Sequence, residues 1–363
     1  MSSELIGRRI SKLRDILNFN DEGILLTNDI NIGYFSGFFH SEGYLLVTRE
    51  RTVLFVDFRY YEAAQNHSYN CDVQCFANFF SDFSYTLKLY GIKNIFFEIS
   101  DLTLAEYFRF KNHMEENSVE CITSDLIDKK ISEIRSIKDD KELEKILKAQ
   151  QITEEAYLEV LNYLKPGVSE RKIAIELEYL IKLKGGSGIS FDLITITGSK
   201  TSLPHGVPSD NIVCEGDLFT FDIGSIYDGY HSDTTRTVAV RYADDEKRKV
   251  YDVVLRAQLE ALKIIRPGIK CSDVDKTARE VIENEGYGKF FGHSTGHGVG
   301  LDIHEAPAVS SKSSIVLQEG MVITDEPGIY LPNKFGVRIE DMICITKDGY
   351  RNFVTLPKEL IIV

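Results

Sequence analysis

Hydrophobic residues in the first part of the chain recur with two different spacings. Intervals of three or four residues predict an amphipathic helix near the N-terminus, at Ile6, Ile10, Leu13 and Leu17. Short apolar runs predict strands, at residues 23–27, 44–48, 52–56 and 94–98. A helical pattern follows at residues 102–115. Because helices and strands alternate, we expect a self-contained α/β domain over residues 1–127.

Charged residues alternate with apolar ones from about residue 128 to residue 164, which predicts long helices with one solvated face. All eight prolines lie at or beyond Pro166, so the composition also changes near this point. A chain of 363 residues is long for a single domain. We therefore expect a second domain over residues 128–363.

The second domain contains a faint internal repeat. Two Pro-Gly pairs, each before a helical pattern, lie 101 residues apart, at residues 166–167 and 267–268. Pro-Gly is a common turn, so this match carries little weight by itself. Acidic residues repeat at similar offsets of 104 and 107 residues, in the pairs Asp222 and Glu326, and Asp233 and Glu340. Two α+β halves, each a helix followed by a hairpin, would place four carboxylates around a pseudo-two-fold axis.

Asp222 lies in an apolar run with the composition of a strand. Asp228-Gly229 follows, which is a strong signal for a two-residue hairpin turn. This turn would place Gly224 opposite Asp233, so that Asp222 and Asp233 share one face within reach of one ion. Two carboxylates this close repel each other, and a divalent cation would relieve the repulsion. The alternative is that both aspartates face solvent from an exposed sheet.

A second hairpin repeats this arrangement. Glu326 lies in the strand-like run 321–330 and Glu340 in the run 337–345, with a turn at residues 332–336 between them. Four carboxylates from two hairpins could hold two cations. Such a pair of ions generates a hydroxide nucleophile near neutral pH.

Three histidines, His293, His297 and His304, fall in a glycine-rich segment at residues 292–305. A neutral imidazole is a good ligand for Zn²⁺, Co²⁺ or Mn²⁺ beside carboxylates. The spacing alone does not select one of the three, and the segment lacks the glutamate of a zincin motif. His205 follows a proline in a turn, from which it could reach into a cleft or serve the turn alone.

Acidic residues outnumber basic ones, 56 to 42, which gives a formal net charge of −14. This charge disfavours binding to nucleic acid and to anionic membranes. No run approaches the roughly 18 apolar residues of a membrane span, and the N-terminus has no signal-peptide pattern. The six cysteines are scattered without a Cys-x-x-Cys pair, which is typical of reduced thiols. We expect a cytoplasmic protein without nucleic-acid or membrane partners.

Five motifs in the second domain resemble those of one family. They are Phe221-Asp-Ile-Gly224, Ser232-Asp-Thr-Thr-Arg-Thr237, Gly296-His-Gly-Val-Gly-Leu-Asp-Ile-His-Glu305, Asp325-Glu-Pro-Gly-Ile-Tyr330 and Arg338-Ile-Glu-Asp341. In this order they are similar to the pita-bread metallopeptidases, which include methionine aminopeptidase, Xaa-Pro aminopeptidase and Xaa-Pro dipeptidase. The resemblance covers about residues 130–363. The first domain is similar to the creatinase-like N-terminal domain of the proline-specific branch.

The resemblance implies roles for individual residues. Two divalent cations, with Mn²⁺ expected ahead of Co²⁺ and Zn²⁺, would be held by Asp222, Asp233, His297, Glu326 and Glu340. Asp233 and Glu340 would bridge both ions, and Glu326 would also shuttle a proton. Four further catalytic residues are implied. His205 and His304 would steady the substrate and its tetrahedral intermediate. His293 would line the cleft, and Arg338 would support the metal shell together with Tyr330.

The resemblance also implies a reaction. The chain would be an exopeptidase that releases the N-terminal residue from peptides with proline second, an Xaa-Pro aminopeptidase, by attack of a hydroxide that bridges the two metals. The segment Val56-Asp-Phe-Arg-Tyr60 resembles the aminopeptidase branch more than the dipeptidase branch. The alternatives are an Xaa-Pro dipeptidase (prolidase) and a non-catalytic pita-bread binding protein. The family further implies a homodimer whose N-terminal domain narrows the active-site entrance.

Overall fold

The chain forms two compact units, Met1–Ile134 and Arg135–Val363, in a computed structural model that describes residues 2–39 and 42–363. The division falls inside helix α6, Leu126–Ser136, later than the limit expected after residue 127. The first part of α6 belongs to the first unit because Asp128 accepts the backbone N–H groups of Ile99 and Ser100 at 3.1 and 2.9 Å. Arg135 instead binds acidic side chains of the second unit.

The first unit is built on a mixed six-stranded sheet with the order β4-β3-β2-β1-β5-β6. Its strands are β1 Glu22–Leu26, β2 Gly43–Thr48, β3 Thr52–Val56, β4 Asp72–Cys75, β5 Asn94–Phe97 and β6 Glu120–Ile122. The predicted strands correspond to β1, β2, β3 and β5, which are almost fully buried. The prediction missed β4 and β6, because these edge strands are short and partly exposed and so lack an apolar pattern.

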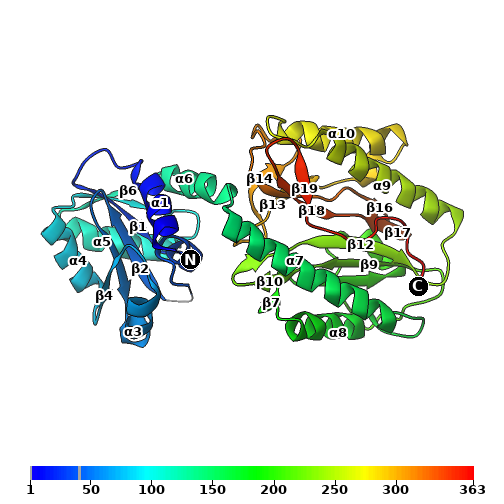
Figure 1. The fold of residues 1–363 in the computed structure, drawn as a ribbon, viewed down its shortest axis with the longest axis horizontal. Helices are drawn as coiled ribbons and strands as arrows, with labels where there is room; N and C mark the ends of the chain where they lie inside the picture. The colour runs from blue at the N-terminus through cyan, green and yellow to red at the C-terminus, as the bar shows by residue number, and fades with distance from the viewer. Residues whose placement is uncertain (1, 40–41) are drawn as a thin grey trace. The chain divides into compact units, whose positions relative to one another are not determined.

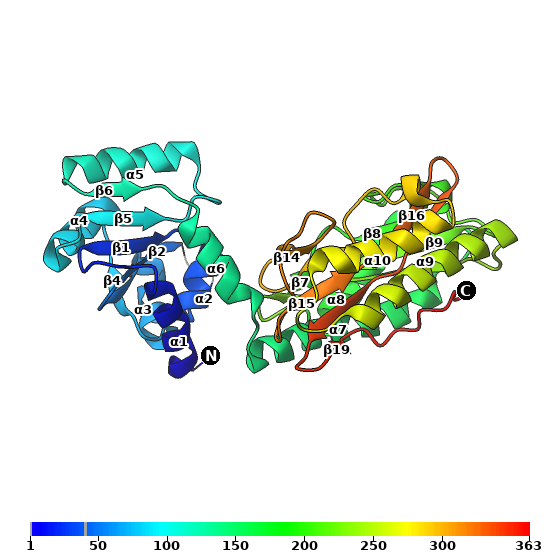
Figure 2. The ribbon, with the colours of Figure 1, turned by 90° about the horizontal axis from the view of Figure 1, so that it is seen from above.

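Helices cover both faces of this sheet. They are α1 Ser3–Arg14, α2 Asp29–Ser36, α3 Phe58–His67, α4 Phe79–Tyr90 and α5 Leu104–Glu116. Phe83 of α4 and Phe110 of α5 share one buried core with Phe55 of β3. Both α1 and α2 contact β2, and Figure 2 shows α1 and α5 on opposite sides of β1 and β5. The first unit is therefore the α/β domain that the alternating pattern predicts.

The first acidic hairpin of the second unit folds in the predicted register. Its strands are β9 Leu218–Ile223 paired with β12 Thr234–Ala239, and β10 Ser225–Tyr227 paired with β11 Tyr230–His231. Tyr227 lies opposite Tyr230, with Asp228 and Gly229 between them. Their φ angles of 49° and 83° are those of a type I′ turn, which matches the twist of a hairpin.

The second acidic hairpin consists of two segments that share one register. The segments are β15 Val322–Asp325 paired with β18 Asp341–Ile345, and β16 Gly328–Leu331 paired with β17 Phe335–Arg338. The pairing is interrupted between them, at Glu326-Pro327 on one side and Ile339-Glu340 on the other. Pro327 contributes to this break because proline has no N–H to donate across a sheet.

Two helix pairs accompany the two hairpins, as the internal repeat predicts. The pairs are α7 Asp140–Val160 with α8 Glu170–Leu183, and α9 Asp245–Ile264 with α10 Cys271–Asn284. An aspartate caps the first helix of each pair, Asp139 and Asp244. The Pro-Gly turn before the second helix places Gly167 and Gly268 at φ of 91° and 88°, a left-handed conformation that favours glycine. In Figure 1 the two pairs lie on opposite sides of β9 and β12.

Short elements complete the second unit. They are β7 Gly188–Ile189, β8 Ile194–Thr197, β13 Gly296–Gly298, β14 Glu305–Val309, β19 Tyr350–Asn352 and single 3-10 turns at Leu161–Tyr163, Gly198–Ser202 and Gly288–Phe290. Strand β8 pairs with β9, and β13 pairs with both β14 and β15. Apolar side chains of α9, α10 and the second hairpin form one large core, which includes Val254, Ala278 and Ile323. Within the described residues, no helix combines the length and the apolar content needed to cross a bilayer.

Replacing Ile323 by alanine tests the core beneath the second hairpin. Ile323 is fully buried, so the smaller side chain should leave a cavity and lower the free energy of unfolding by about 2–5 kcal/mol. Ile175 on α8 is 62% exposed, and Ile175→Ala should change stability by less than about 0.5 kcal/mol. Urea unfolding measured by circular dichroism compares the two variants, and equal losses would contradict this view of the core.

Candidate metal centre

The predicted site residues of the second unit meet at one cavity of about 590 Å³. Its lining includes Asp222, Asp233, His297, Glu326, Glu340, His205, His293, His304 and Arg338. Much of the remaining wall is apolar, with Phe191, Leu193, Ile194, Val207, Pro208 and Ala308. A cavity of roughly 300–1,000 Å³ with a few convergent polar groups is typical of sites for small ligands.

Three side chains converge most closely. The ligand atoms of Asp233, His297 and Glu340 all lie within 4.8 Å of one another. Nε2 of His297 lies 3.4 Å from Oδ2 of Asp233 and 3.5 Å from Oε1 of Glu326. Donor atoms from three separate segments of the chain, the two hairpins and β13, therefore surround one centre.

The interrupted pairing of the two hairpins places these acids together. The backbone N–H of Glu340 donates to the carbonyl oxygen of Thr235 at 3.1 Å, which joins the second hairpin to the first. The N–H of Glu326 donates to the carbonyl oxygen of Thr295 at 2.8 Å. Asp233 lies at the interruption of the first hairpin, opposite Gly224. A Cβ at Gly224 would lie 2.0 Å from the carbonyl oxygen of Ser232, so this close approach requires glycine.

Thr235 is a part of the site that the sequence analysis missed. Its Oγ1 donates to Oε2 of Glu340 at 2.7 Å and accepts a hydrogen bond from Nε of Arg338 at 3.0 Å. Thr235 follows Asp233 by two residues. Because side chains in an extended strand alternate between two faces, this spacing could have identified it.

Burial and mutual repulsion dominate the electrostatics of the acids. Burial, with a further contribution from Asp222, raises the pKa of Asp233 to about 6. Burial likewise raises the pKa of Glu326 to about 7. Burial and then the charges of Asp233 and Glu326 raise the pKa of Glu340 well above its usual range. Buried carboxylates at such distances are unfavourable unless a proton or a cation neutralises them.

The arrangement of His297 fits a metal ligand. Burial by itself would lower the pKa of His297, but the hydrogen bond to Asp233 and the charge of Glu326 raise it to about 9. Nδ1 lies 3.1 Å from the carbonyl oxygen of Gly298, so a proton on Nδ1 leaves the lone pair of Nε2 directed at the acids. Carboxylate oxygens with one imidazole are a donor set that suits divalent cations. The residues present therefore fit such ions.

A chain of hydrogen bonds connects Asp222 with His293. Arg338 donates from Nη2 to Oδ2 of Asp222 at 2.5 Å and from Nη1 to the hydroxyl of Tyr330 at 2.7 Å. The same hydroxyl lies 2.8 Å from Nε2 of His293. Burial, helped by the positive charge of Arg338, lowers the pKa of His293 to about 4. This ring is therefore neutral at neutral pH.

His304 lines the same cavity as the acids. The segment that carries His304 is held by a buried cluster of ion pairs at the next residue. The rings of His297 and His304 are perpendicular, with centroids 4.3 Å apart. The next residue, Glu305, binds Nη2 of Arg135 at 2.8 Å and Nζ of Lys138 at 2.7 Å. These bases were not predicted, because they lie far from Glu305 in the chain and share no motif with it.

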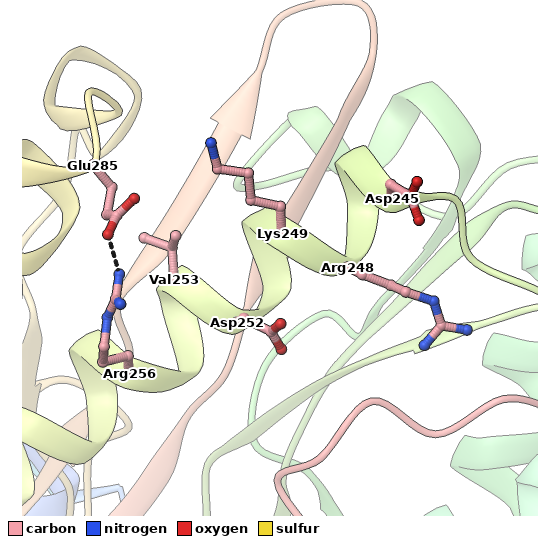
Figure 3. A pocket seen from close by; sticks show the side chains of 7 residues that line it. All are labelled: Asp245, Arg248, Lys249, Asp252, Val253, Arg256 and Glu285. Atoms are coloured by element: carbon pink, nitrogen blue, oxygen red, sulfur yellow. Dashed lines mark hydrogen bonds and ion pairs between the residues drawn. The ribbon is translucent and has the colours of Figure 1, made fainter.

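A second, more open cavity of about 360 Å³ lies along α9. Figure 3 shows that Lys249 points away from Arg248 and Asp252 there. Among the side chains drawn, one ion pair joins Arg256 to Glu285 at 2.6 Å. None of the predicted site residues lines this cavity, and its charges do not converge. The cavity of about 590 Å³, which the predicted site residues line, is therefore the candidate active site.

Comparison with known families and relatives agrees with this architecture. The model of metallopeptidase family M24 matches residues 144–347, and that of the Creatinase/Prolidase N-terminal domain matches residues 9–137. The Xaa-Pro dipeptidase of Pyrococcus horikoshii is 37% identical, over 99% of this chain and 100% of its own length. The Xaa-Pro dipeptidase of Pyrococcus furiosus is 38% identical, over 96% of this chain and 99% of its own.

Solved structures extend the comparison to the fold. An Xaa-Pro dipeptidase from Bacillus anthracis superimposes with a TM-score of 0.94 at 38% identity, over 99% of this chain and 100% of that one. An X-Pro aminopeptidase from Thermotoga maritima gives 0.90 at 35% identity, over 98% of this chain and 100% of that one. These similarities confirm the predicted creatinase-like domain and pita-bread domain. The chain belongs to metallopeptidase family M24 and carries the Creatinase/Prolidase type of N-terminal domain.

Proposed function

We propose that this chain is a metal-dependent Xaa-Pro dipeptidase, a prolidase, which hydrolyses dipeptides with proline in the second position. The observation that carries the proposal is the convergence of four carboxylates and one imidazole on a single cavity. Relatives from two Pyrococcus species and a structure from Bacillus anthracis bear this name. From the sequence alone the aminopeptidase ranked first, but the named relatives favour the dipeptidase.

Two divalent cations would be held by Asp222, Asp233, His297, Glu326 and Glu340, with Mn²⁺ as the first choice before Co²⁺ and Zn²⁺. When bound, such ions supply a Lewis acid for the substrate carbonyl and a strong nucleophile from water near neutral pH. Two points support the fit of these residues to divalent cations. Carboxylates and an imidazole are suitable donors, and the buried acids repel one another when no cation neutralises them.

The protein's own groups would complete the reaction. Glu326 would take up at Oε1 the proton that the attacking water loses, and would pass it to the prolyl nitrogen as the peptide bond breaks. Imidazole N–H groups of His205 and His304 would donate to the carbonyl oxygen as negative charge develops on it. A prolyl peptide bond has no N–H, so recognition by strand pairing is weakened. The apolar wall near Phe191 and Leu193 would instead bind the pyrrolidine ring by shape and exclude water.

An Xaa-Pro aminopeptidase is the second candidate, and two observations favour it. The related structure from Thermotoga maritima bears this name. In addition, Arg338 is the one arginine or lysine among the described residues that line the cavity, and Asp222 already binds it. A dipeptide presents a free carboxylate that requires a positive partner, whereas a longer peptide does not. A homodimer and a cytoplasmic location stay predictions.

Hydrolysis of Ala-Pro, Ala-Pro-Ala and Ala-Ala in the presence of Mn²⁺ separates the candidates. We expect Ala-Pro to be cleaved with a kcat/KM at least about 10-fold above that of Ala-Pro-Ala, because a dipeptidase uses both substrate ends for binding. Ala-Ala, which lacks the ring, is the control, and a chelator should abolish all cleavage. Faster cleavage of Ala-Pro-Ala would support the aminopeptidase. Failure to cleave either prolyl peptide with Mn²⁺, Co²⁺ or Zn²⁺ would contradict both.

Replacing Glu340 by glutamine tests the metal site. The amide keeps the size of the side chain but removes its charge, so we expect fewer metal ions per chain by mass spectrometry. We also expect kcat to fall by more than about 100-fold, since even an outer partner of a metal ligand is worth about 10–100-fold. Exposed Glu319 provides the matched control, Glu319→Gln, which should change neither quantity. Full metal content in Glu340→Gln would rule out this ligand.

Replacing His304 by alanine separates a substrate contact from a metal ligand. Loss of a donor to the developing negative charge should lower kcat by about 100–1,000-fold while the metal content stays unchanged. His67→Ala at the exposed end of α3 is the control and should leave both unchanged. Loss of metal in His304→Ala would show that our division between ligands and substrate contacts is wrong.

A further inference from the structure

One wall of the cavity is a loop that begins after β8 and ends at Ser209. It contains the 3-10 turn Gly198–Ser202 and contributes Pro204, His205, Gly206, Val207 and Pro208 to the cavity lining. Val207 is apolar yet 71% exposed, so a ligand in the cavity would cover it. The position of this loop therefore decides the shape of the cavity on this side.

Both ends of the loop bind one buried carboxylate, that of Glu170 at the start of α8. Oε1 of Glu170 accepts the backbone N–H of Thr197 at 2.9 Å, where the loop begins. Oε2 accepts the N–H and the hydroxyl of Ser209 at 2.9 and 2.8 Å, where the loop ends. Lys200, inside the loop, donates from Nζ to the same Oε2 at 2.7 Å. Glu170 is fully buried, so these bonds form away from water.

Helix α8 holds the end of the loop through its backbone as well. The N–H of Arg171 donates to the carbonyl oxygen of Ser209 at 2.9 Å, and that of Glu170 donates to Asn211 at 3.0 Å. The first turn of a helix has such N–H groups free for outside partners. The buried side chains of Ile173 and Leu177 fix α8 in the core, so the helix is a firm support.

The charge of Glu170 matters more than its size. Hydrogen bonds between an ammonium group and a carboxylate are about twice as strong as those between neutral groups. In Glu170→Gln, one oxygen becomes an NH₂ group, which cannot accept a hydrogen bond from Lys200, Ser209 or Thr197. The loop would then lose an anchor, whereas the core contacts of α8 would remain.

We propose that Glu170 is a positioning residue. Its hydrogen bonds to Thr197, Lys200 and Ser209 hold in place the loop that carries His205 and forms one wall of the cavity. Glu170 does not line the cavity, and within the described residues its carboxylate binds Thr197 at the end of β8 and Lys200 and Ser209 of the loop. Its effect on a substrate therefore passes through the position of the loop. This role in substrate placement rests on the proposed function.

Limited trypsin digestion of the Mn²⁺-loaded protein tests the loop without any substrate. In the native protein, Nζ of Lys200 is bound and its side chain is 18% exposed, so cleavage after Lys200 should be slow. In Glu170→Gln the loop should open more often, so we expect cleavage after Lys200 to be at least about 10-fold faster, identified by mass spectrometry of the fragments. The same digestion rate in both proteins would overturn the proposal.

Glu98 provides a matched control in the first unit. It is also a buried glutamate, and it accepts the N–H groups of Thr27 and Asn28 at 2.7 and 3.1 Å. Glu98→Gln should leave the cleavage rate after Lys200 unchanged. Faster cleavage there in Glu98→Gln as well would indicate general destabilisation and would count against the specific role of Glu170.

Kinetics with Ala-Pro test whether the loop acts through His205. Misplacement of a contact can cost up to about 100-fold, so we expect Glu170→Gln to lower kcat/KM by about 10–100-fold with unchanged metal content. In the His205→Ala background, the same substitution should change kcat/KM by less than about 2-fold, because the contact is already lost. If Glu170→Gln lowered kcat/KM equally in both backgrounds, the proposal that Glu170 positions His205 would be overturned. If the native protein cleaves no Xaa-Pro peptide, the proposed function fails, while the digestion result still decides the anchoring of the loop.

Discussion

The second unit buries several carboxylates at one place, where they repel one another. This repulsion is the constraint that the rest of the unit has to overcome. Asp233, Glu326 and Glu340 all have raised pKa values, and one imidazole, that of His297, faces them with its Nε2. Charges of one sign would separate if their backbones were mobile. The structure prevents this by carrying the acids at interruptions between paired strands, and these strands pack on buried cores. Acids that need a proton or a cation to neutralise them are thereby held together.

The internal repeat explains how two similar halves build such a site. Each hairpin loses its regular pairing at an acidic residue, Asp233 in one and Glu340 in the other. The N–H of Glu340 then pairs with Thr235 of the first hairpin, so the two halves are joined at the acids themselves. Each hairpin is accompanied by a helix pair, which supplies the rigid support on its own side of the strands (Figure 1).

Features encoded within a few residues could be predicted from the sequence. Asp228-Gly229 determines the first hairpin turn and its register, and the burial of β1, β2, β3 and β5 leaves an apolar pattern. Contacts between distant residues could not be predicted. Glu170 and Ser209 lie 39 residues apart, and Lys138 and Glu305 lie 167 apart. No local pattern marks such partners, because their meeting depends on the packing of whole elements. The two hairpins alone predicted the four acids as ligands, whereas the choice of His297 relied on the family motifs, because spacing left three histidines open.

The direction of the hydrogen bonds around Tyr330 and His293 determines the tautomer of His293. A guanidinium can only donate, so the hydroxyl oxygen of Tyr330 accepts from Arg338. The carbonyl oxygen of Ser294 can only accept, so Nδ1 of the neutral His293 ring is protonated, and the proton of Tyr330 points to the unprotonated Nε2. The Nδ1 proton is donated to the carbonyl oxygen of Ser294 at 2.8 Å. Both ring nitrogens are thus engaged within the protein. His293 can give the cavity its shape, but it has no nitrogen left with which to exchange a proton with a substrate.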